Sequence, residues 1–252
     1  MKKIFFSTLL AIVMSAFCLT SCHKASYPST AEVFKDAVTA YDGNTYDAVK
    51  IGDQVWMASN LKTKHFADGA EIPESKTTDL TSAMRYKPKC SNSQLNDFGY
   101  LYNWKAAVNG KEISATSTEK VQGVCPNGWH IPTLTEWKNL ISYLESDTRY
   151  RSGDSCANIG KALASQSHWK SCATAHTVGN RPASNNATGF TAMPAGTYFG
   201  TSFSTGEYAY FWSATPYDST YAYGTYLFYR FTNATTSFAN KGDGFSVRCV
   251  KD

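Results

Sequence analysis

Hydrophobic residues recur at helical spacing most clearly in the middle of the chain. Four large apolar residues stand at positions i, i+3, i+4 and i+7 and would form one stripe on a helix: Trp137, Leu140, Ile141 and Leu144. Thr133 and Glu136 precede this stripe at the spacing of a capping box. We therefore predict a helix over 134–146 that packs on the core, and a weaker second helix over 159–169.

Short runs of strand-forming residues, separated by turn residues, occupy much of the remaining chain. Residues 45–51 and 54–57 flank a Gly-Asp turn, which predicts an opening pair of antiparallel strands. Further strands are predicted for three runs in the last third of the chain: 190–193, 226–231 and 245–250. Two helices with several antiparallel strands are typical of an α+β domain. We expect one such domain over 41–252, because no linker interrupts this range.

The first 21 residues have the pattern of an export signal. Lys2 and Lys3 precede a largely apolar run over 4–19, which is shorter than the roughly 20 residues that a membrane-spanning helix needs. The run ends in Leu-Thr-Ser-Cys, the pattern of a bacterial lipobox, in which the cysteine is diacylated and becomes the first residue after cleavage. We therefore expect a lipoprotein signal peptide over 1–21 and a lipid anchor on Cys22.

Residues 22–40 contain Pro28 and several Ser and Thr residues but no strong hydrophobic period. This composition predicts a tether between the lipid and the domain. The rest of the chain has no apolar run of membrane-spanning length, so lipid on Cys22 is the expected link to the membrane. The expected location is the cell envelope, as an outer-membrane lipoprotein, and the sequence leaves open which side of that membrane it faces.

The amino-acid composition of the chain argues against some kinds of protein and of binding partner. Charged residues make up 17% of the chain and aromatic residues 14%, which excludes a disordered chain. The formal net charge is only +4, and the one basic run is Lys2-Lys3. We therefore expect no nucleic-acid partner.

The chain has seven cysteines, of which one leaves with the signal peptide and one takes the lipid. The other five would lie in an oxidising compartment and could form two bridges in 15 ways, with one thiol left over. Cys156 and Cys172 bracket a segment of 15 residues, which favours a local bridge. A bridge between Cys125 and Cys249 would tie the middle of the chain to its last strand, and Cys90 would then be free.

The sequence lacks the patterns of common metal and catalytic sites. It contains no CxxC, HExxH or GxSxG motif and no glycine-rich phosphate loop. The five histidines are scattered, and His130, between Trp129 and Ile131, is more typical of a structural side chain. We therefore expect no metal, no cofactor and no catalytic residue.

An aromatic-rich segment is the remaining candidate for recognition, because 14 of the 34 residues in 198–231 are aromatic. Tyr221 and Tyr223 are two residues apart, so both side chains face the same way in an extended chain. Tyrosine offers a large contact area at low entropic cost and can stack on sugar rings. We take Tyr217, Asp218, Tyr221 and Tyr223 as candidate ligand-binding residues; the alternative is that these rings cover the sheet of the domain.

Six motifs, in order along the chain, resemble those of one known family. They are DGNTY at 42–46, VKIGDQVWMASNL at 49–61, GYLYNW at 99–104, CPNGWHIPT at 125–133, FWSAT at 211–215 and GFSVRCVKD at 244–252. This pattern is similar to that of the Fibrobacter succinogenes major paralogous domain. Members are typically bacterial cell-surface or secreted proteins, often lipoproteins, with no common biochemical activity. We expect the motif tryptophans to be core residues, because Trp buries a large area: Trp56, Trp104, Trp129, Trp137 and Trp212.

The run WHIPTLTEW at 129–137 also resembles a run in formylglycine-generating-enzyme-type domains, which have a C-type-lectin-like fold. This resemblance implies two helices beside a small twisted antiparallel sheet with long loops. It further implies a long-range disulfide to the last strand, here Cys125–Cys249. We therefore expect that bridge and Cys156–Cys172, with Cys90 free and buried. The calcium-binding runs of sugar-binding lectins are absent.

These expectations combine into a hypothesis about function. The chain is expected to be a lipid-anchored surface binding or adhesion module without catalysis, whose ligand is a glycan or another surface protein. Two alternatives stay open: a structural envelope protein without a ligand, and a formylglycine-type oxidase that uses a free thiol and copper.

Overall fold

The computed structural model describes residues 31–200 and 202–252. The expected signal peptide over 1–21 and the expected lipid site Cys22 lie outside the described residues. Among the helices of the described part of the chain, none is both long and apolar enough to cross a membrane.

A five-stranded antiparallel sheet contains both ends of the described chain. Its strand order is β1-β2-β3-β12-β6, and the bounds are β1 Glu32–Thr39, β2 Thr45–Ile51, β3 Gln54–Met57, β12 Val250–Lys251 and β6 Trp129–His130. β2 and β3 confirm the predicted opening pair of strands, and Gly52, at φ +61°, lies in the turn between them. Val250 pairs with Trp56 on one side and with His130 on the other. The end of the chain therefore joins the opening strands to the segment before the long helix.

The assignment of residues 22–40 to a tether is wrong for its last part. Residues 32–39 form β1, which pairs antiparallel with β2 and ends the sheet on one side. All but one of its residues are exposed, so this edge strand has no hydrophobic period that a sequence reading could detect. Asp36 has a φ of +48° and lies where the register shifts between Phe34 and Val38. β1 is thus held by backbone pairing and by an ion pair of 2.7 Å between Lys35 and Asp47.

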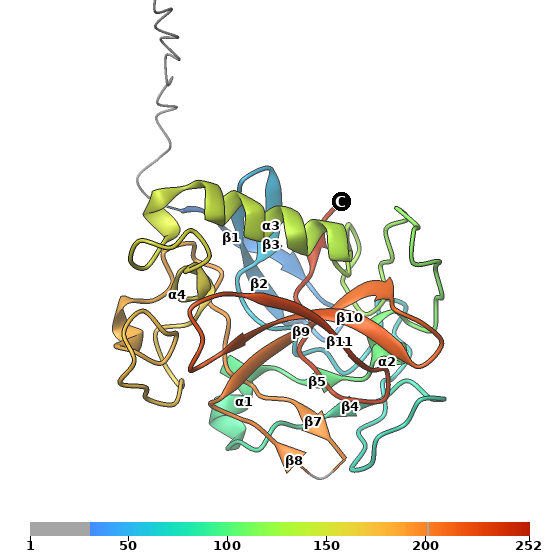
Figure 1. Cartoon of the computed structure of the whole chain (residues 1–252). Coiled ribbons are helices and arrows are strands. Elements are labelled where there is room, and N and C mark those ends of the chain that lie inside the picture. Colours follow the sequence, from blue (N-terminus) through green and yellow to red (C-terminus); the bar gives the residue numbers. More distant parts are fainter. Residues whose placement is uncertain (1–30, 201) are drawn as a thin grey trace, which may run out of the picture.

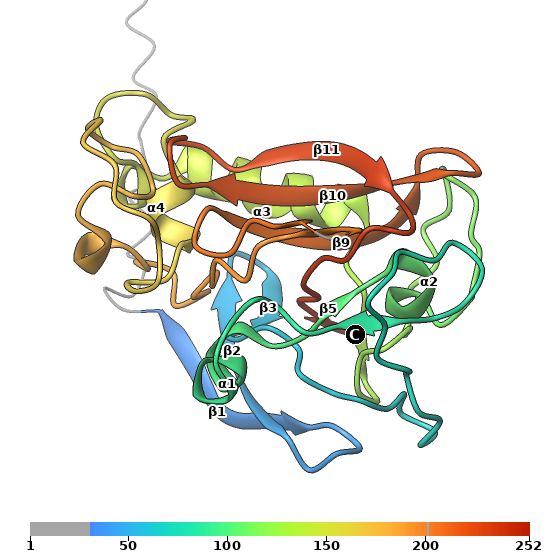
Figure 2. The same cartoon turned by 90° about the horizontal axis from the view of Figure 1, so that it is seen from below.

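A second sheet of three strands has the order β11-β10-β9, with bounds Thr235–Asn240, Tyr221–Phe228 and Tyr208–Pro216. Figure 2 shows the two sheets as separate layers, with β1 and β11 on opposite sides of the molecule. Two short antiparallel pairs complete the strands: β4 Arg85–Tyr86 with β5 Leu101–Tyr102, and β7 Tyr198–Phe199 with β8 Ser202–Phe203.

The main helix, α3, spans Leu134–Ser146 and confirms the prediction at both ends. Thr133 and Glu136 form the expected capping box, and α3 lies across β9, β10 and β11 (Figure 1). The remaining helices are short: α1 Asn92–Phe98, α2 Trp104–Ala107, α4 Gly160–Leu163, and two 3-10 turns at Thr148–Tyr150 and Pro182–Ser184. The fold is therefore α+β, with mostly antiparallel strands and long loops.

Four predicted elements, one helix and three strands, are shorter or different in the structure. The helix predicted over 159–169 is the single turn α4, because the chain at 164–165 instead pairs with Ala192. That bridge also replaces the strand predicted over 190–193. The strand predicted over 226–231 is β10, which begins and ends earlier in the chain. The strand predicted over 245–250 forms isolated bridges and then β12.

The five motif tryptophans are core residues, as predicted, and each is at most 3% exposed. The indole N–H groups of Trp104, Trp137 and Trp212 donate to backbone carbonyls, which satisfies their hydrogen-bonding need inside the core. β9 is buried along almost its whole length. Its alternate residues enter two different apolar clusters, so this strand joins the two halves of the core.

Candidate functional site

Four aromatic side chains gather at one end of the three-stranded sheet, and we call them the aromatic patch: Tyr217, Tyr221, Tyr223 and Phe238. Tyr217 and Phe238 stack with ring centroids 4.4 Å apart and rings 11° from parallel. Tyr223 meets Tyr217 edge-on at 5.5 Å, and Tyr221 meets Phe238 edge-on at 5.8 Å. The four rings therefore form one continuous group.

The patch faces solvent. The exposed fractions are 48% for Tyr217, 38% for Tyr221 and 48% for Phe238, while Tyr223 is half-buried. None of the four belongs to the apolar clusters found in the described part of the chain. The alternative that these rings serve as core does not hold for the three exposed ones. A group of exposed aromatic rings offers a ligand apolar surface without disturbing the interior.

The strand pattern explains why these rings share one face. Tyr221 and Tyr223 alternate with Ala222 on β10, and Ala222 is buried in the core below. Phe238 lies on β11 directly opposite Tyr223, so the two are cross-strand neighbours. Phe238 was not predicted, because the pairing of β10 with β11 is not visible in the sequence. The available signal was a single large aromatic residue in a run of small polar residues.

Asp218 shapes the loop that carries Tyr217. Its Oδ1 accepts hydrogen bonds of 2.7 Å from the backbone N–H groups of Thr220 and Tyr221. The N–H of Tyr217 donates to the carbonyl of Tyr221, which closes the turn. Asp218 therefore holds the turn in place. The contact with a ligand that the sequence predicts for it stays a prediction.

One cation lies beside this loop. The ammonium of Lys241 is 4.4 Å from the centroid of the Trp104 ring and donates to the carbonyl of Ser219. Burial lowers the pKa of Lys241, and the nearby carboxylates of Glu112 and Asp218 oppose that shift. The lysine is thus anchored under the loop next to the patch.

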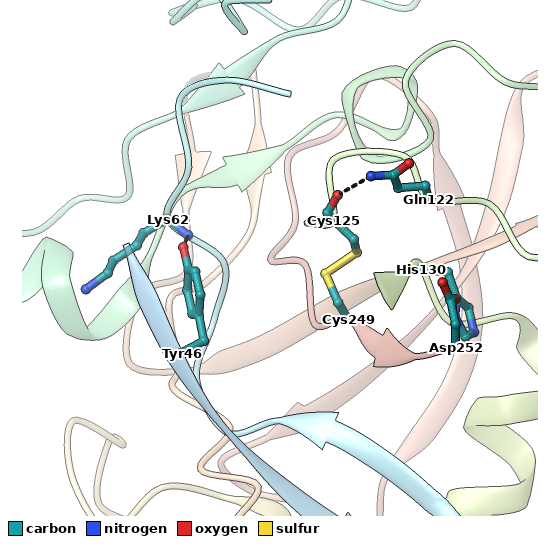
Figure 3. Close-up of a disulfide and its surroundings, with 7 residues drawn as sticks. All are labelled: Tyr46, Lys62, Gln122, Cys125, His130, Cys249 and Asp252. Carbon is teal, nitrogen blue, oxygen red and sulfur yellow. Dashed lines mark hydrogen bonds and ion pairs between the residues drawn. A yellow bond between two sulfur atoms is a disulfide. The ribbon is translucent and has the colours of Figure 1, made fainter. Parts of the chain in front are cut away.

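The disulfide predicted between Cys125 and Cys249 is confirmed (Figure 3). The two Cα atoms are 6.0 Å apart although 124 residues separate them in sequence. Cys249 directly precedes β12, and Cys125 lies four residues before β6. The bridge therefore fixes the last strand against the segment that leads into α3.

The predicted bridge between Cys156 and Cys172 is wrong, because both cysteines are free. Each lies in its own short loop. The N–H of Ser152 donates to the carbonyl of Asn158, whose side-chain amide donates back to the carbonyl of Ser152, and these two bonds enclose Cys156. The N–H of Cys172 donates to the carbonyl of Gly179. A hydrogen bond from the Thr177 hydroxyl, the largest cause, lowers the pKa of Cys172. Proximity in sequence therefore did not bring the two sulfur atoms together.

Cys90 is also free, as predicted, but it is half-buried rather than fully buried. Burial raises the pKa of its thiol, and nearby Lys87 only partly opposes that rise. Among the residues that the structure describes, no group of three or more His, Cys, Asp or Glu side chains could hold a metal ion.

His130 is buried between two carboxylates. Its Nδ1 is 2.7 Å from Oδ1 of Asp252, and its Nε2 is 2.8 Å from Oε1 of Glu136 (Figure 3 shows the first pair). Burial tends to raise the pKa of Glu136, but hydrogen bonds from His130 and Thr133 outweigh it and lower that pKa. His130 thus joins the start of α3 to the last residue of the chain, which fits the structural role expected from the sequence.

The chain was compared with family models, with curated proteins and with solved structures, and only a family model matches it. No curated protein and no solved structure matches the chain. The model of the Fibrobacter succinogenes major domain matches residues 49–251, which includes all the elements from β3 to β12 and the end of β2. The chain therefore belongs to the Fibrobacter succinogenes major domain family.

Proposed function

We propose that this protein is a lipid-anchored module of the cell envelope that binds a glycan or another surface protein, without catalysis. The observation that carries the proposal is the exposed aromatic patch. Its four rings contact one another on β10, β11 and the turn before β10, and none of them belongs to the core that contains the five tryptophans. Rigid aromatic side chains lose little conformational entropy when they contact a ligand.

The composition of the surrounding loop supports recognition. Asp218, Ser219 and Thr220 offer hydrogen-bonding groups next to the rings, and the turn bonds of Asp218 hold them in place. A sugar ring presents an apolar face and a rim of hydroxyl groups, which match an aromatic surface with polar neighbours. A protein ligand would use the same rings as contact anchors.

We further propose that the fold is C-type-lectin-like. Support comes from the disulfide between Cys125 and the last strand, and from α3 packed beside small antiparallel sheets. Long loops connect several of these elements, and the aromatic patch lies on the short turn between β9 and β10 and on β10 and β11.

The oxidase alternative requires a free thiol in the C-terminal motif. In the structure the sulfur of Cys249 is bonded to Cys125, so that motif offers no thiol. Cys90, Cys156 and Cys172 remain free and lie outside the motifs shared with the family.

A glycan and surface-protein array, probed with the detergent-solubilised full chain, tests the binding proposal. We expect selective binding to a small set of related ligands. An array with no selective signal would favour the alternative of a structural envelope protein that has no ligand.

The anchor is tested separately by Cys22→Ser. This variant should leave the membrane fraction, because lipid on Cys22 is the only anchor that the proposal provides. Retention of the variant in carbonate-washed membranes would contradict the lipid-anchor part of the proposal.

A further inference from the structure

A second candidate site lies away from the aromatic patch, where three segments meet around a cavity of about 490 Å³. The turn between β1 and β2 contributes Tyr41 and Asp42, and the chain after β3 contributes Lys62, Lys64 and His65. The third wall includes α1. The volume is within the range of small-molecule sites, roughly 300–1,000 Å³. We call it the Tyr41 cavity.

A carboxylate and a histidine are paired in this cavity. Oδ1 of Asp42 lies 2.5 Å from Nδ1 of His65, and Oδ2 accepts a hydrogen bond of 2.6 Å from the backbone N–H of Lys64. Both oxygens of Asp42 are therefore engaged by the protein. Nε2 of His65 has no protein partner among the described residues, and the side chain is partly exposed. The pairing fixes the imidazole ring and leaves Nε2 for a ligand.

The cavity has an excess of positive charge. Lys62 and Lys64 line it, and Asp42 is its one lining carboxylate. Neither lysine forms an ion pair within the part of the chain that the structure describes. The backbone N–H of Lys62 donates to the hydroxyl of Tyr46, and the side chain runs away from that ring (Figure 3). The backbone is thus held in place while the ammonium group stays unpaired.

An exposed aromatic ring completes the site. Tyr41 is 63% exposed, and its ring centroid is 5.5 Å from that of His65. Gly69, at φ +90°, lies against the phenol end of this ring, where a Cβ would come within 2.7 Å of Cζ. A glycine is therefore required for Tyr41 to lie where it does, and one side of the ring remains open to solvent.

We propose that the Tyr41 cavity binds a carboxylated sugar, such as a uronic acid residue of an acidic glycan. Tyr41 provides a face for the sugar ring, Lys62 and Lys64 bind the carboxylate, and Nε2 of His65 accepts a hydrogen bond from a sugar hydroxyl group. The amide side chains of Asn44 and Asn96, which also line the cavity, offer donors and acceptors for hydroxyl groups. A bare inorganic anion would use the cations but not the aromatic ring or the amides. The proposal goes beyond the function proposed for the aromatic patch and does not depend on it.

Trigalacturonate and its methyl ester are matched probes, because the ester keeps the sugar rings and hydroxyl groups while each carboxylate loses its charge and gains one methyl group. Calorimetric titration of the detergent-solubilised full chain should show at least about tenfold tighter binding of trigalacturonate. Absence of trigalacturonate binding, or equal affinity for the ester, would overturn the proposal.

Paired variants locate the binding. Lys62→Gln/Lys64→Gln should weaken trigalacturonate binding about tenfold, whereas Lys120→Gln/Lys138→Gln makes the same charge change elsewhere on the surface and should change it by less than about twofold. Equal losses in both variants would show a general charge effect and overturn the site. Tyr41→Ala should weaken binding of both saccharides, and unchanged affinity in that variant would remove the sugar-stacking role.

The aromatic-patch variant Tyr217→Ala/Phe238→Ala separates the two proposals. It should leave trigalacturonate affinity unchanged if the sugar binds in the Tyr41 cavity. If this variant loses trigalacturonate while Lys62→Gln/Lys64→Gln keeps it, the acidic sugar binds at the aromatic patch. The proposed function would then stand and the inference about the cavity would fail.

Discussion

At the scale of single residues, Arg248 is the most constrained side chain of the C-terminal motif. It is fully buried, and its guanidinium donates to the carbonyls of Met57, Phe190 and Thr191 and to the side-chain oxygen of Asn60. Burial lowers its pKa to about 9, so the group stays charged at neutral pH. The guanidinium carbon also lies 4.2 Å from the centroid of the Phe190 ring. One residue of the last motif therefore joins the loop after β3 to the loop before β7.

Asp243 gives a pH-dependent prediction. Burial raises its pKa from an ordinary value of 3.8 to about 6, although a backbone hydrogen bond from Asn240 opposes the shift. The carboxyl group therefore holds its proton more tightly in the folded state than in the unfolded state. Its contribution to the stability of the fold falls as the pH rises from 3.8 to about 6. Asp243→Asn removes this titration and should stabilise the protein above about pH 6. Because the group is half-buried and screened by solvent, we expect a gain of about 1 kcal/mol.

Urea unfolding of wild type and Asp243→Asn at about pH 4 and about pH 7.5 measures this effect. The difference in free energy of unfolding should be near zero at the lower pH and favour the variant at the higher one. An equal difference at both pH values would show that titration of Asp243 is not the cause.

At the scale of elements, the sequence predicted what depends on local chemistry. The capping box of α3, its apolar stripe and the turn between β2 and β3 all depend on residues a few positions apart. β1 could not be predicted, because an exposed edge strand has no hydrophobic period and depends on its partner β2. The pairing of Asp42 with His65 could not be predicted either, because the two residues lie 23 positions apart and meet only in the folded chain.

The candidate site was predicted only in part for the same physical reason. Tyr221 and Tyr223 follow from strand alternation, and the position of Tyr217 follows from the turn before that strand. Phe238 enters the patch through cross-strand pairing, which the sequence does not show. The pairing of Cys156 with Cys172 failed because a short loop length says nothing about the direction in which each sulfur points.

The capping box of α3 gives a prediction for an element. Thr133 Oγ1 accepts from the N–H of Glu136 at 3.2 Å, and Glu136 Oε2 accepts from the N–H of Thr133 at 2.8 Å. Thr133→Ala should therefore cost about 1 kcal/mol of stability. Glu136→Ala should cost more, because Glu136 also contacts His130.

A double-mutant cycle of these two substitutions should show coupling of about 0.5–1 kcal/mol, measured by urea unfolding. Thr135→Ala is the matched control, since Thr135 is exposed on the same turn, and it should change stability by less than about 0.5 kcal/mol. Simple additivity of the two losses would contradict a reciprocal cap.

At the scale of the whole molecule, the Cys125–Cys249 bridge closes a loop that contains α3 and the three-stranded sheet. A bridge across such a long loop restricts the unfolded chain strongly. Cys125→Ala/Cys249→Ala should therefore lower the free energy of unfolding by roughly 4 kcal/mol.

The variant Cys156→Ser/Cys172→Ser is the matched control for that experiment. Both thiols are free, so we expect the free energy of unfolding to change by less than about 1 kcal/mol. A reductant should destabilise this variant and the wild type to the same extent. A large loss in this control, or a peptide map that links Cys156 to Cys172, would restore the second bridge.

Recognition by the aromatic patch is the central claim, and a side-by-side array measures it most directly. The full-length wild type, Tyr217→Ala/Phe238→Ala and the control Phe231→Ala are applied to the same glycan and surface-protein array. Phe231 is an exposed aromatic residue, at 42%, that contacts Phe228 instead of the patch. Loss of two contact rings should weaken the selective signals at least about tenfold, while the control keeps them and all three proteins unfold at similar temperatures. Equal signals from wild type and the patch variant would contradict the claim.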